Sequence, residues 1–206
     1  MRGREWGMFA LLGLIWGSSF LWIKIALGNG GAPVFGIAMP GPAGAFSPLL
    51  LVTMRILFGV LGLAALIAAR GTALPREPRT IAMAALVGFV NTALPFALIT
   101  WGETRIPSGM ASILNGTVPL FTLVIAHFLL HDEPMTPWRA LGLIVGFIGV
   151  VVLVGHDSGG LSGSGWGQLA VVGAAICYAV GASISRRYLR GLSALTQSFT
   201  TLAFAV

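Results

Sequence analysis

The sequence predicts an all-α membrane protein, a multi-span helical bundle. Hydrophobic residues make up 56% of the 206 residues, charged residues make up only 9%, and the apolar residues gather in long continuous runs. A soluble domain carries roughly 25% charged residues, which help to cover its surface in water. The runs lack two-residue alternation, which favours helices over the strands of a membrane barrel. We therefore expect the chain to lie in a lipid bilayer.

The spans follow from the length of these runs. A helix needs about 20 apolar residues to cross a hydrocarbon core of about 30 Å. A seventh run begins near residue 195 and continues to Val206. The first run is longer than the core of a signal peptide and contains two tryptophans, so an uncleaved span is favoured. The six expected spans lie near residues 7–27, 47–69, 80–100, 107–130, 139–155 and 164–185.

The positive charge is arranged as in a membrane protein. The net charge is +6, and the basic residues sit mainly in short loops between apolar runs. Cytoplasmic loops of membrane proteins carry an excess of Lys and Arg. If the N-terminus is cytoplasmic, nine of the twelve Lys and Arg lie on that side, namely Arg2, Arg4, Arg70, Arg76, Arg79, Arg139, Arg186, Arg187 and Arg190. We expect a multi-pass protein of the inner membrane with a cytoplasmic N-terminus, and the charge does not indicate nucleic-acid binding.

Motifs for catalysis, metal or cofactor binding are not found. Cys177 is the single cysteine, which excludes an internal disulfide. His127 and His131 are four residues apart but have no third ligand nearby, so no metal site is expected. The sequence contains no G-x-x-x-x-G-K-[ST], G-x-S-x-G or H-E-x-x-H motif. No cofactor is expected, and an intramembrane enzyme is the less favoured alternative.

The chain divides into two parts of unequal length. Residues 156–163 are rich in Gly and Ser and are expected to form a linker between residues 1–155 and residues 164–206. The second part repeats the start of the first weakly. The matching pairs are Trp6 with Trp166, Trp16 with Tyr178 and Lys24 with Arg186. Because five spans are an odd number, a second copy would enter the membrane inverted, as in many secondary transporters.

An ordered set of residues resembles the EamA-like branch of the drug/metabolite transporter superfamily. The set consists of Trp16-Gly17-Ser18-Ser19-Phe20 with Lys24, then Arg55, Pro119, Asp132-Glu133-Pro134, the glycines Gly142, Gly146 and Gly149, and Tyr178 with Ser185-Arg186-Arg187. The resemblance implies ten spans in two inverted repeats, with residues 1–155 as the first repeat and a truncated second repeat after the linker. A fragment without activity of its own, or a chain completed by a partner, is the alternative.

The fourth span carries the longest polar stripe. At 100° per residue, its polar residues fall within an arc of about 80°. Polar groups are costly in lipid, so this stripe is expected to face protein or a water-filled path. Substrate contact and bonding between helices stay open for the serines, and the path is favoured for Asn115. Pro119 frees a backbone carbonyl near Asn115. The stripe consists of Ser108, Ser112, Asn115, Pro119 and Thr122.

The third and first spans supply further candidates. Asn91 shares a face with Pro95, and it either lies across a cavity from Asn115 or bonds to it. Trp16 and Phe20 are four residues apart with Ser19 beside them, and such aromatic rings suit a flat or amphipathic organic substrate. Tyr178, the counterpart of Trp16 after the linker, ranks next. Lys24 is expected to extend to the outer surface.

Two charged residues have structural or gating interpretations. Arg55 lies about eight residues into the second span, where a charge costs at least ~2.5–3.5 kcal/mol. A partner is therefore expected, either a helix-end carbonyl or a carboxylate such as Glu103, and a direct role in holding an anionic substrate is the sharper alternative. Glu133 is interpreted as structural. Pro95 and Pro119 join Arg55 and Glu133 in this group.

The favoured function is a secondary transporter, in the direction of export, of a small organic metabolite across the inner membrane by alternating access. Its expected partners are the small-molecule substrate and the lipid bilayer, and a homo-oligomer stays open. The predicted substrate pathway consists of Trp16, Ser19, Phe20, Asn91, Ser112, Asn115 and Tyr178.

Overall fold

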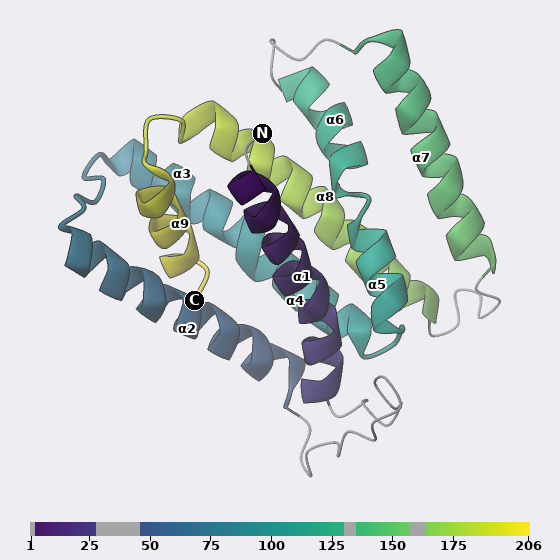
Figure 1. Cartoon of the computed structure of the whole chain (residues 1–206), viewed down its shortest axis with the longest axis horizontal. Coiled ribbons are helices and arrows are strands. Elements are labelled where there is room, and N and C mark those ends of the chain that lie inside the picture. The colour runs from purple at the N-terminus through teal and green to yellow at the C-terminus, as the bar shows by residue number, and fades with distance from the viewer. Residues whose placement is uncertain (1–2, 28–45, 130–134, 157–163) are drawn as a thin grey trace.

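The computed structural model describes residues 3–27, 46–129, 135–156 and 164–206. This part of the chain is almost entirely helical and contains no strand, which confirms the all-α bundle (Figure 1). The expected linker at 157–163 and Glu133 lie outside the described residues. The helices are α1 Gly3–Ala26, α2 Pro48–Arg70, α3 Pro78–Gly88, the π-helix η1 Phe89–Ala93, α4 Leu94–Glu103, α5 Ser108–Asn115, α6 Val118–Leu129, α7 Pro137–His156, α8 Ser164–Tyr188 and α9 Ala194–Ala203.

Five helical stretches of the described chain are long and apolar enough to cross a membrane. A sixth apolar helix, Pro137–Val152, is shorter. The expected seventh span corresponds to α9. Its helix ends at Ala203, and the N–H of Ala205 bonds to the carbonyl of Leu202 in a tighter turn. The five stretches are Glu5–Ala26, Pro48–Arg70, Pro78–Glu103, Ser108–Leu129 and Gly165–Tyr188.

Local sequence explains where α2 begins and ends. The Ser47 hydroxyl accepts the N–H of Leu50 at 3.2 Å, which caps the first turn, and Pro48 occupies the first helical position. The helix ends at Gly71, whose φ of 59° is left-handed and suits glycine. These signals place the helix within one residue of the predicted span at each end.

Two prolines shape the third and fourth spans differently. Pro95 has no N–H, and the preceding turn widens into the π-helix η1, where the N–H of Leu94 bonds to the carbonyl of Phe89. The fourth span is interrupted at residues 116–117, between α5 and α6. The Thr117 hydroxyl donates to the carbonyl of Leu114 at 2.6 Å there, and Pro119 follows in α6. The break lies next to Asn115, where the sequence predicted a freed carbonyl.

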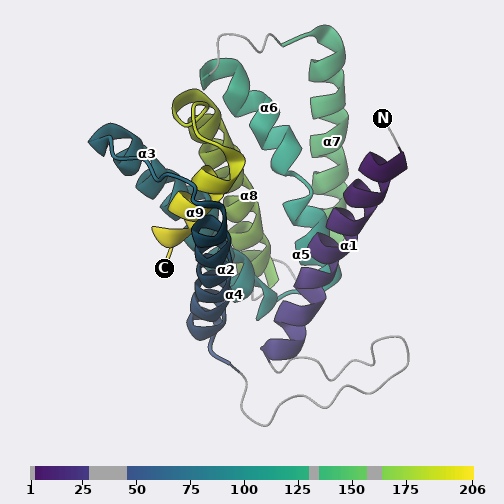
Figure 2. The same ribbon diagram turned by 60° about the vertical axis from the view of Figure 1, so that its left-hand side comes forward.

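Helix α8 lies at the centre of the bundle. It packs against α3, η1, α4, α5 and α6, and half of its apolar stretch is buried. A Cβ atom on Gly102 of α4 would come within 2.9 Å of the Gly167 carbonyl oxygen of α8, so the two backbones approach closely. In contrast, α7 packs mainly on α6 at the edge of the bundle (Figures 1 and 2). There Gly146 of α7 lies against the Leu120 side chain.

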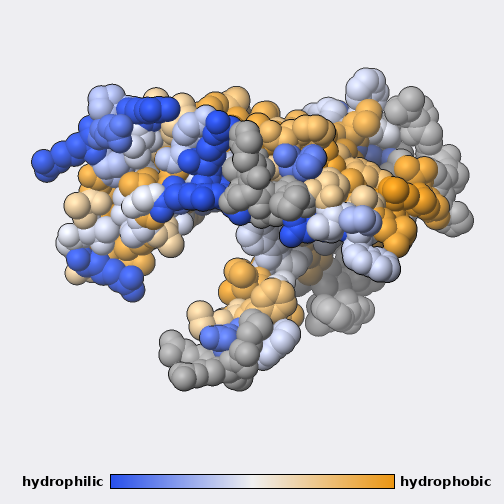
Figure 3. Space-filling model, turned by 90° about the horizontal axis from the view of Figure 1, so that it is seen from above, coloured by the Kyte–Doolittle hydropathy of each residue, from blue (hydrophilic) through white to orange (hydrophobic). Residues whose placement is uncertain are grey.

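Polar residues mark the two ends of the bundle. The upper end in Figure 1 holds the start of α1, the α2–α3 connection and the ends of α6 and α8. The Arg187 guanidinium donates to the Leu129 carbonyl at 3.1 Å at this end. Figure 3 looks onto the upper end and shows hydrophilic residues gathered on it beside hydrophobic flanks. The lower end holds the end of α1, the start of α2 and the α4–α5 turn (Figure 1).

Helix α1 is packed along only part of its length. Its residues 5–18 are exposed, whereas Phe20, Ile23 and Leu27 are buried in the main core. Figure 2 shows α1 leaning away from α2 and α4 toward the upper end. The packed part of α1 therefore forms one wall of the space between α1, α2 and α4.

Candidate functional site

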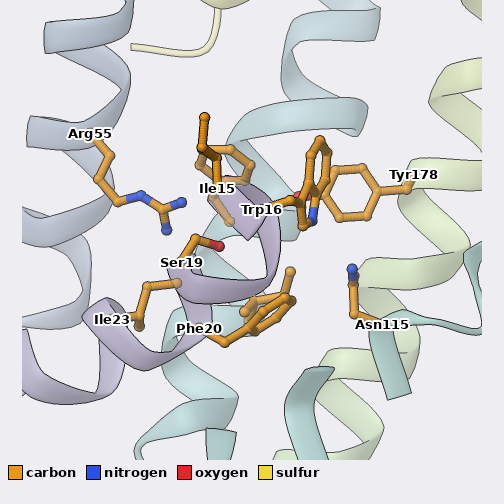
Figure 4. A pocket seen from close by; sticks show the side chains of 10 residues that line it. Ile15, Trp16, Ser19, Phe20, Ile23, Arg55, Asn115 and Tyr178 are labelled. Carbon is orange, nitrogen blue, oxygen red and sulfur yellow. The ribbon is translucent and has the colours of Figure 1, made fainter. Parts of the chain in front are cut away.

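A pocket lies where α1, α2, α4, α5 and α8 meet (Figure 4). Its cavity has a volume of about 190 Å³. Typical small-molecule pockets measure roughly 300–1,000 Å³, so the described helices enclose a small site or part of a larger one. Ten residues line the pocket, namely Ile15, Trp16, Ser19, Phe20, Ile23, Arg55, Phe96, Ile99, Asn115 and Tyr178.

Half of this lining comes from one face of α1. Residues at spacings of three and four share a face of a helix, and this rule brings Trp16, Ser19, Phe20 and Ile23 together. Phe20 is 5% exposed, whereas Trp16 is 54% exposed. Phe20 therefore belongs to the packed part of the wall, and Trp16 lies where α1 leaves the other described helices.

Arg55 reaches into the pocket from α2, on the side opposite Tyr178 and Asn115 (Figure 4). Its guanidinium carbon lies 4.9 Å from the centre of the Phe96 ring, a cation–π contact. The structure gives this guanidinium no hydrogen bond and no ion pair with any described residue. The expectation that it pairs with a helix-end carbonyl or with the Glu103 carboxylate is wrong for the described chain, because Glu103 acts on it only through a longer-range electrostatic attraction.

Lys24 and Glu103 form a separate cluster near the lower end. The Lys24 ammonium donates to the backbone carbonyls of Glu103 at 2.6 Å and Ile106 at 3.0 Å. Lys24 therefore ties α1 to the end of α4 instead of extending to the surface as predicted. The Glu103 side chain is fully buried, one of its oxygens accepts the Ser108 hydroxyl at 3.3 Å, and the other has no partner in the described chain. Glu103 follows Ile99 by four residues on α4, so the cluster lies one turn beyond the pocket.

Asn115 and Tyr178 complete the polar lining. Asn115 ends α5 at the break in the fourth span, and Tyr178 comes from the central helix α8. The Asn115 side-chain oxygen is buried and has no hydrogen-bond partner among the described residues. Buried amide oxygens are nearly always bonded, so this one marks a place where a ligand or a water can supply a donor.

Two predicted pathway residues and two prolines predicted to be gating or structural do not line the pocket. Asn91 packs against α8, where a Cβ atom on Gly181 would meet the Asn91 Cβ at 2.5 Å. Asn91 does not line this pocket, and it does not bond to Asn115 in the described chain, so the alternative of a bond between the two is wrong, whereas its place in a substrate pathway stays a prediction. Ser112 is half-buried and does not line the pocket, Pro95 is buried, and Pro119 is exposed.

The sequence analysis missed the apolar part of the lining. Ile15, Ile23, Phe96 and Ile99 carry no chemical signal that separates them from other apolar residues of the spans. The spacing of Ile23 from Ser19 on α1 offered one clue, because residues four apart share a face of a helix. Nothing in the sequence indicated that Phe96 would meet Arg55.

A second cavity adjoins the first. It lies between α1 and α2, has a volume of about 470 Å³ and also includes Trp22, Ala26 and Leu51. The two cavities share Arg55 and three residues of α1, namely Ile15, Ser19 and Ile23. Arg55 therefore stands where the two spaces join. Within the described ranges, no three His, Cys, Asp or Glu side chains gather as metal ligands would.

Residues 5–155 match the sequence model of the EamA-like transporter family. The chain is 28% identical over 200 residues to the "Uncharacterized inner membrane transporter YedA" of Escherichia coli (strain K12), a match that covers 97% of this chain and 58% of that relative. It is 34% identical over 80 residues to the "Probable terminal-alkyne amino-acid exporter" of Streptantibioticus cattleyicolor, covering 38% of this chain and 27% of the relative.

A third relative is the "S-adenosylmethionine uptake transporter" of Rickettsia conorii, 42% identical over 53 residues, which covers 26% of this chain and 18% of that protein. No solved structure matches the chain. Over its full extent, the chain spans about 58% of the length of the Escherichia coli relative.

Proposed function

This chain belongs to the EamA-like transporter family, and on that premise we propose that it forms part of a secondary transporter of a small organic solute. The pocket between α1, α2, α4, α5 and α8 is the proposed substrate site. The observation that carries the proposal is its lining, in which five helices of the membrane-spanning set direct aromatic rings, one guanidinium and one unpaired amide oxygen into a single cavity. Relatives named as transporters support this reading over the intramembrane enzyme.

Alternating access is the proposed mechanism. Secondary transporters place their substrate near the middle of the bilayer, where interrupted helices expose backbone groups. The interruption between α5 and α6 lies beside Asn115, which supports such a site in this chain. We assign residues 1–155 to a first five-helix repeat and residues 164–206 to the start of an inverted second repeat. The match of the family model to residues 5–155 supports the first boundary.

The proposed orientation places the upper end of the bundle in the cytoplasm and the protein in the inner membrane. The described basic residues of the α2–α3 connection, the start of α7 and the end of α8 belong to this end. Their excess over the lower end matches the charge bias of cytoplasmic loops. Export is the proposed direction. One relative is named an exporter and another an uptake transporter, and a transport measurement distinguishes the two directions.

The test uses cells that overproduce the complete gene product. Efflux of metabolites into the medium is followed by mass spectrometry for the unmodified protein and for Trp16→Ala and Asn115→Ala. Both variants are expected to lose most of the transport while reaching the membrane in normal amounts, because each removes a pocket contact. Trp138→Ala is the matched control, since Trp138 lies on α7 and is 82% exposed. Normal transport in both pocket variants would place the substrate site elsewhere.

A further inference from the structure

We propose that the pocket selects a small organic anion, whose charged group binds Arg55 and whose apolar or aromatic body lies against Trp16, Phe20 and Tyr178. The inference rests on the proposed function, in which this pocket is the substrate site. It adds the chemical class of the substrate, namely a carboxylate or a similar anion attached to an apolar body.

Arg55 brings unused hydrogen-bond donors to the pocket, as far as the described residues show. A guanidinium has five N–H donors in a planar fork, and this shape fits a carboxylate with two parallel hydrogen bonds. In the described chain the Arg55 guanidinium contacts the Phe96 ring and bonds to nothing. The ring attracts the charge but accepts none of the five donors in a conventional hydrogen bond. An anion in the cavity supplies the acceptors that the protein does not.

The charged side chains in and near the pocket favour an anion over a cation. Glu103 acts electrostatically on both Lys24 and Arg55, and Tyr178 also acts on Arg55. The Lys24 ammonium is held by two backbone carbonyls, and the Glu103 carboxyl group is held by Ser108. The three side chains sum to +1 when Glu103 is ionised and to +2 when it is protonated. Excess charge inside a membrane is costly, and a bound anion reduces it while a bound cation increases it.

The wall of the pocket that faces Arg55 suits an apolar or aromatic body. Figure 4 shows Tyr178 and Asn115 on the opposite side of the cavity, with Trp16 and Phe20 between them and Arg55. Aromatic rings bind flat apolar groups, and the unpaired side-chain oxygen of Asn115 can accept one hydrogen bond from a ligand. The lining thus orients a ligand with its anionic end toward α2 and its apolar body toward α8.

The test measures binding of three probes that share one ring and differ in charge. The 206-residue chain is placed in lipid nanodiscs and titrated calorimetrically with benzoate, benzamide and benzylammonium, and the heats of empty nanodiscs are subtracted. We expect benzoate to bind at least about tenfold more tightly than benzamide, and benzylammonium to bind most weakly. Trp16→Ala is expected to weaken the binding of benzoate and benzamide alike.

Variants of Arg55 separate its charge from its shape. Arg55→Gln is expected to abolish the preference for benzoate over benzamide. Arg55→Lys keeps the charge without the planar fork and is expected to retain a smaller preference. Arg105→Gln is the matched control, because Arg105 is exposed and does not line the pocket. Its guanidinium carbon lies 3.6 Å from the centre of the Trp101 ring.

Each outcome of the titrations has a distinct meaning. Equal affinity for benzoate and benzamide in the unmodified chain would overturn the inference and leave the proposed pocket standing, provided that Trp16→Ala weakens both. If Trp16→Ala leaves the affinity of the probes unchanged, or if no probe binds, both the proposed substrate site and the inference are overturned. A benzoate preference that survives Arg55→Gln would reject Arg55 as the anion-binding group.

Discussion

The link between Lys24 and the end of α4 makes a strong prediction about stability. Replacing Lys24 with Met keeps a similar apolar chain but removes the two bonds to the carbonyls of Glu103 and Ile106. Hydrogen bonds that involve a charged group contribute about 1.5–3 kcal/mol each, so the gross loss is about 3–6 kcal/mol. The variant also avoids the cost of keeping an ammonium in the membrane, which is about 2.5–3.5 kcal/mol at the centre of a span and smaller for Lys24 in the last turn of α1. With about 2 kcal/mol for that cost, the expected net loss of stability is about 1–4 kcal/mol.

Unfolding in mixed micelles measures this loss. The purified chain is titrated with sodium dodecyl sulfate, and helix content is followed by circular dichroism for the unmodified protein, Lys24→Met and Arg105→Met. Arg105 is the matched control because it also lies near the lower end but, among the residues that the structure describes, its guanidinium bonds only to its close neighbours Trp101 and Thr104. The midpoint is expected to fall for Lys24→Met and to change little for Arg105→Met.

The same titration can refute the reasoning. If Lys24→Met unfolds within about 0.5 kcal/mol of the unmodified chain, a change typical of surface positions, the two carbonyl bonds contribute no net stability. Lys24 would then behave as a side chain that extends to the membrane surface. An equal loss of stability in Arg105→Met would show that any cation at this end contributes to stability. The link between α1 and α4 would then have no contribution of its own.

Three further predictions test packing, polarity and orientation. A Cβ atom on Gly88 would overlap the Thr201 carbonyl, so Gly88→Ala is expected to lower stability by about 1–3 kcal/mol in the detergent titration; a neutral result would show that α3 and α9 separate easily. Thr100→Val replaces a fully buried hydroxyl that has no partner in the described chain, and stability is expected to stay equal or to rise by up to ~1 kcal/mol; a clear loss would reveal a partner. Orientation is tested with single cysteines in a cysteine-free background and a maleimide that does not cross the inner membrane. The reagent is expected to label Arg105→Cys in intact cells and Ala73→Cys only after the inner membrane is opened. The reverse pattern would show that the proposed orientation is inverted.

The sequence predicted the spans well because lipid imposes a simple rule. The second span was expected at residues 47–69 and the helix covers Pro48–Arg70. The third was expected at residues 80–100 and extends to Glu103 instead. The expectation stopped short of a charged residue, whereas the structure buries that carboxyl group beside Ser108. Tertiary contacts, which a run of apolar residues does not reveal, thus lengthen the helix.

The candidate site was predictable to the extent that polar residues within spans must avoid lipid. Trp16, Ser19, Phe20, Asn115 and Tyr178 come together around one cavity. Asn91 and Ser112 have the same kind of chemistry and lie outside it. Helical periodicity tells which residues share a face, but it does not tell which helix that face meets. The contact of Asn91 with Gly181 joins residues far apart in the chain, and no local pattern indicates it.

Lys24 and Arg55 show how position along a helix decides what an intramembrane cation does. The last carbonyls of a helix have no partner within it, and Lys24 lies beside such carbonyls at the end of α4 and in the α4–α5 turn. Arg55 lies in the interior of α2, where its neighbours offer an aromatic face and no unpaired carbonyl. Backbone groups therefore satisfy Lys24, which becomes a structural link. Arg55 keeps its donors unbonded within the described chain and faces the cavity, which is why we assign ligand binding to Arg55 and stability to Lys24.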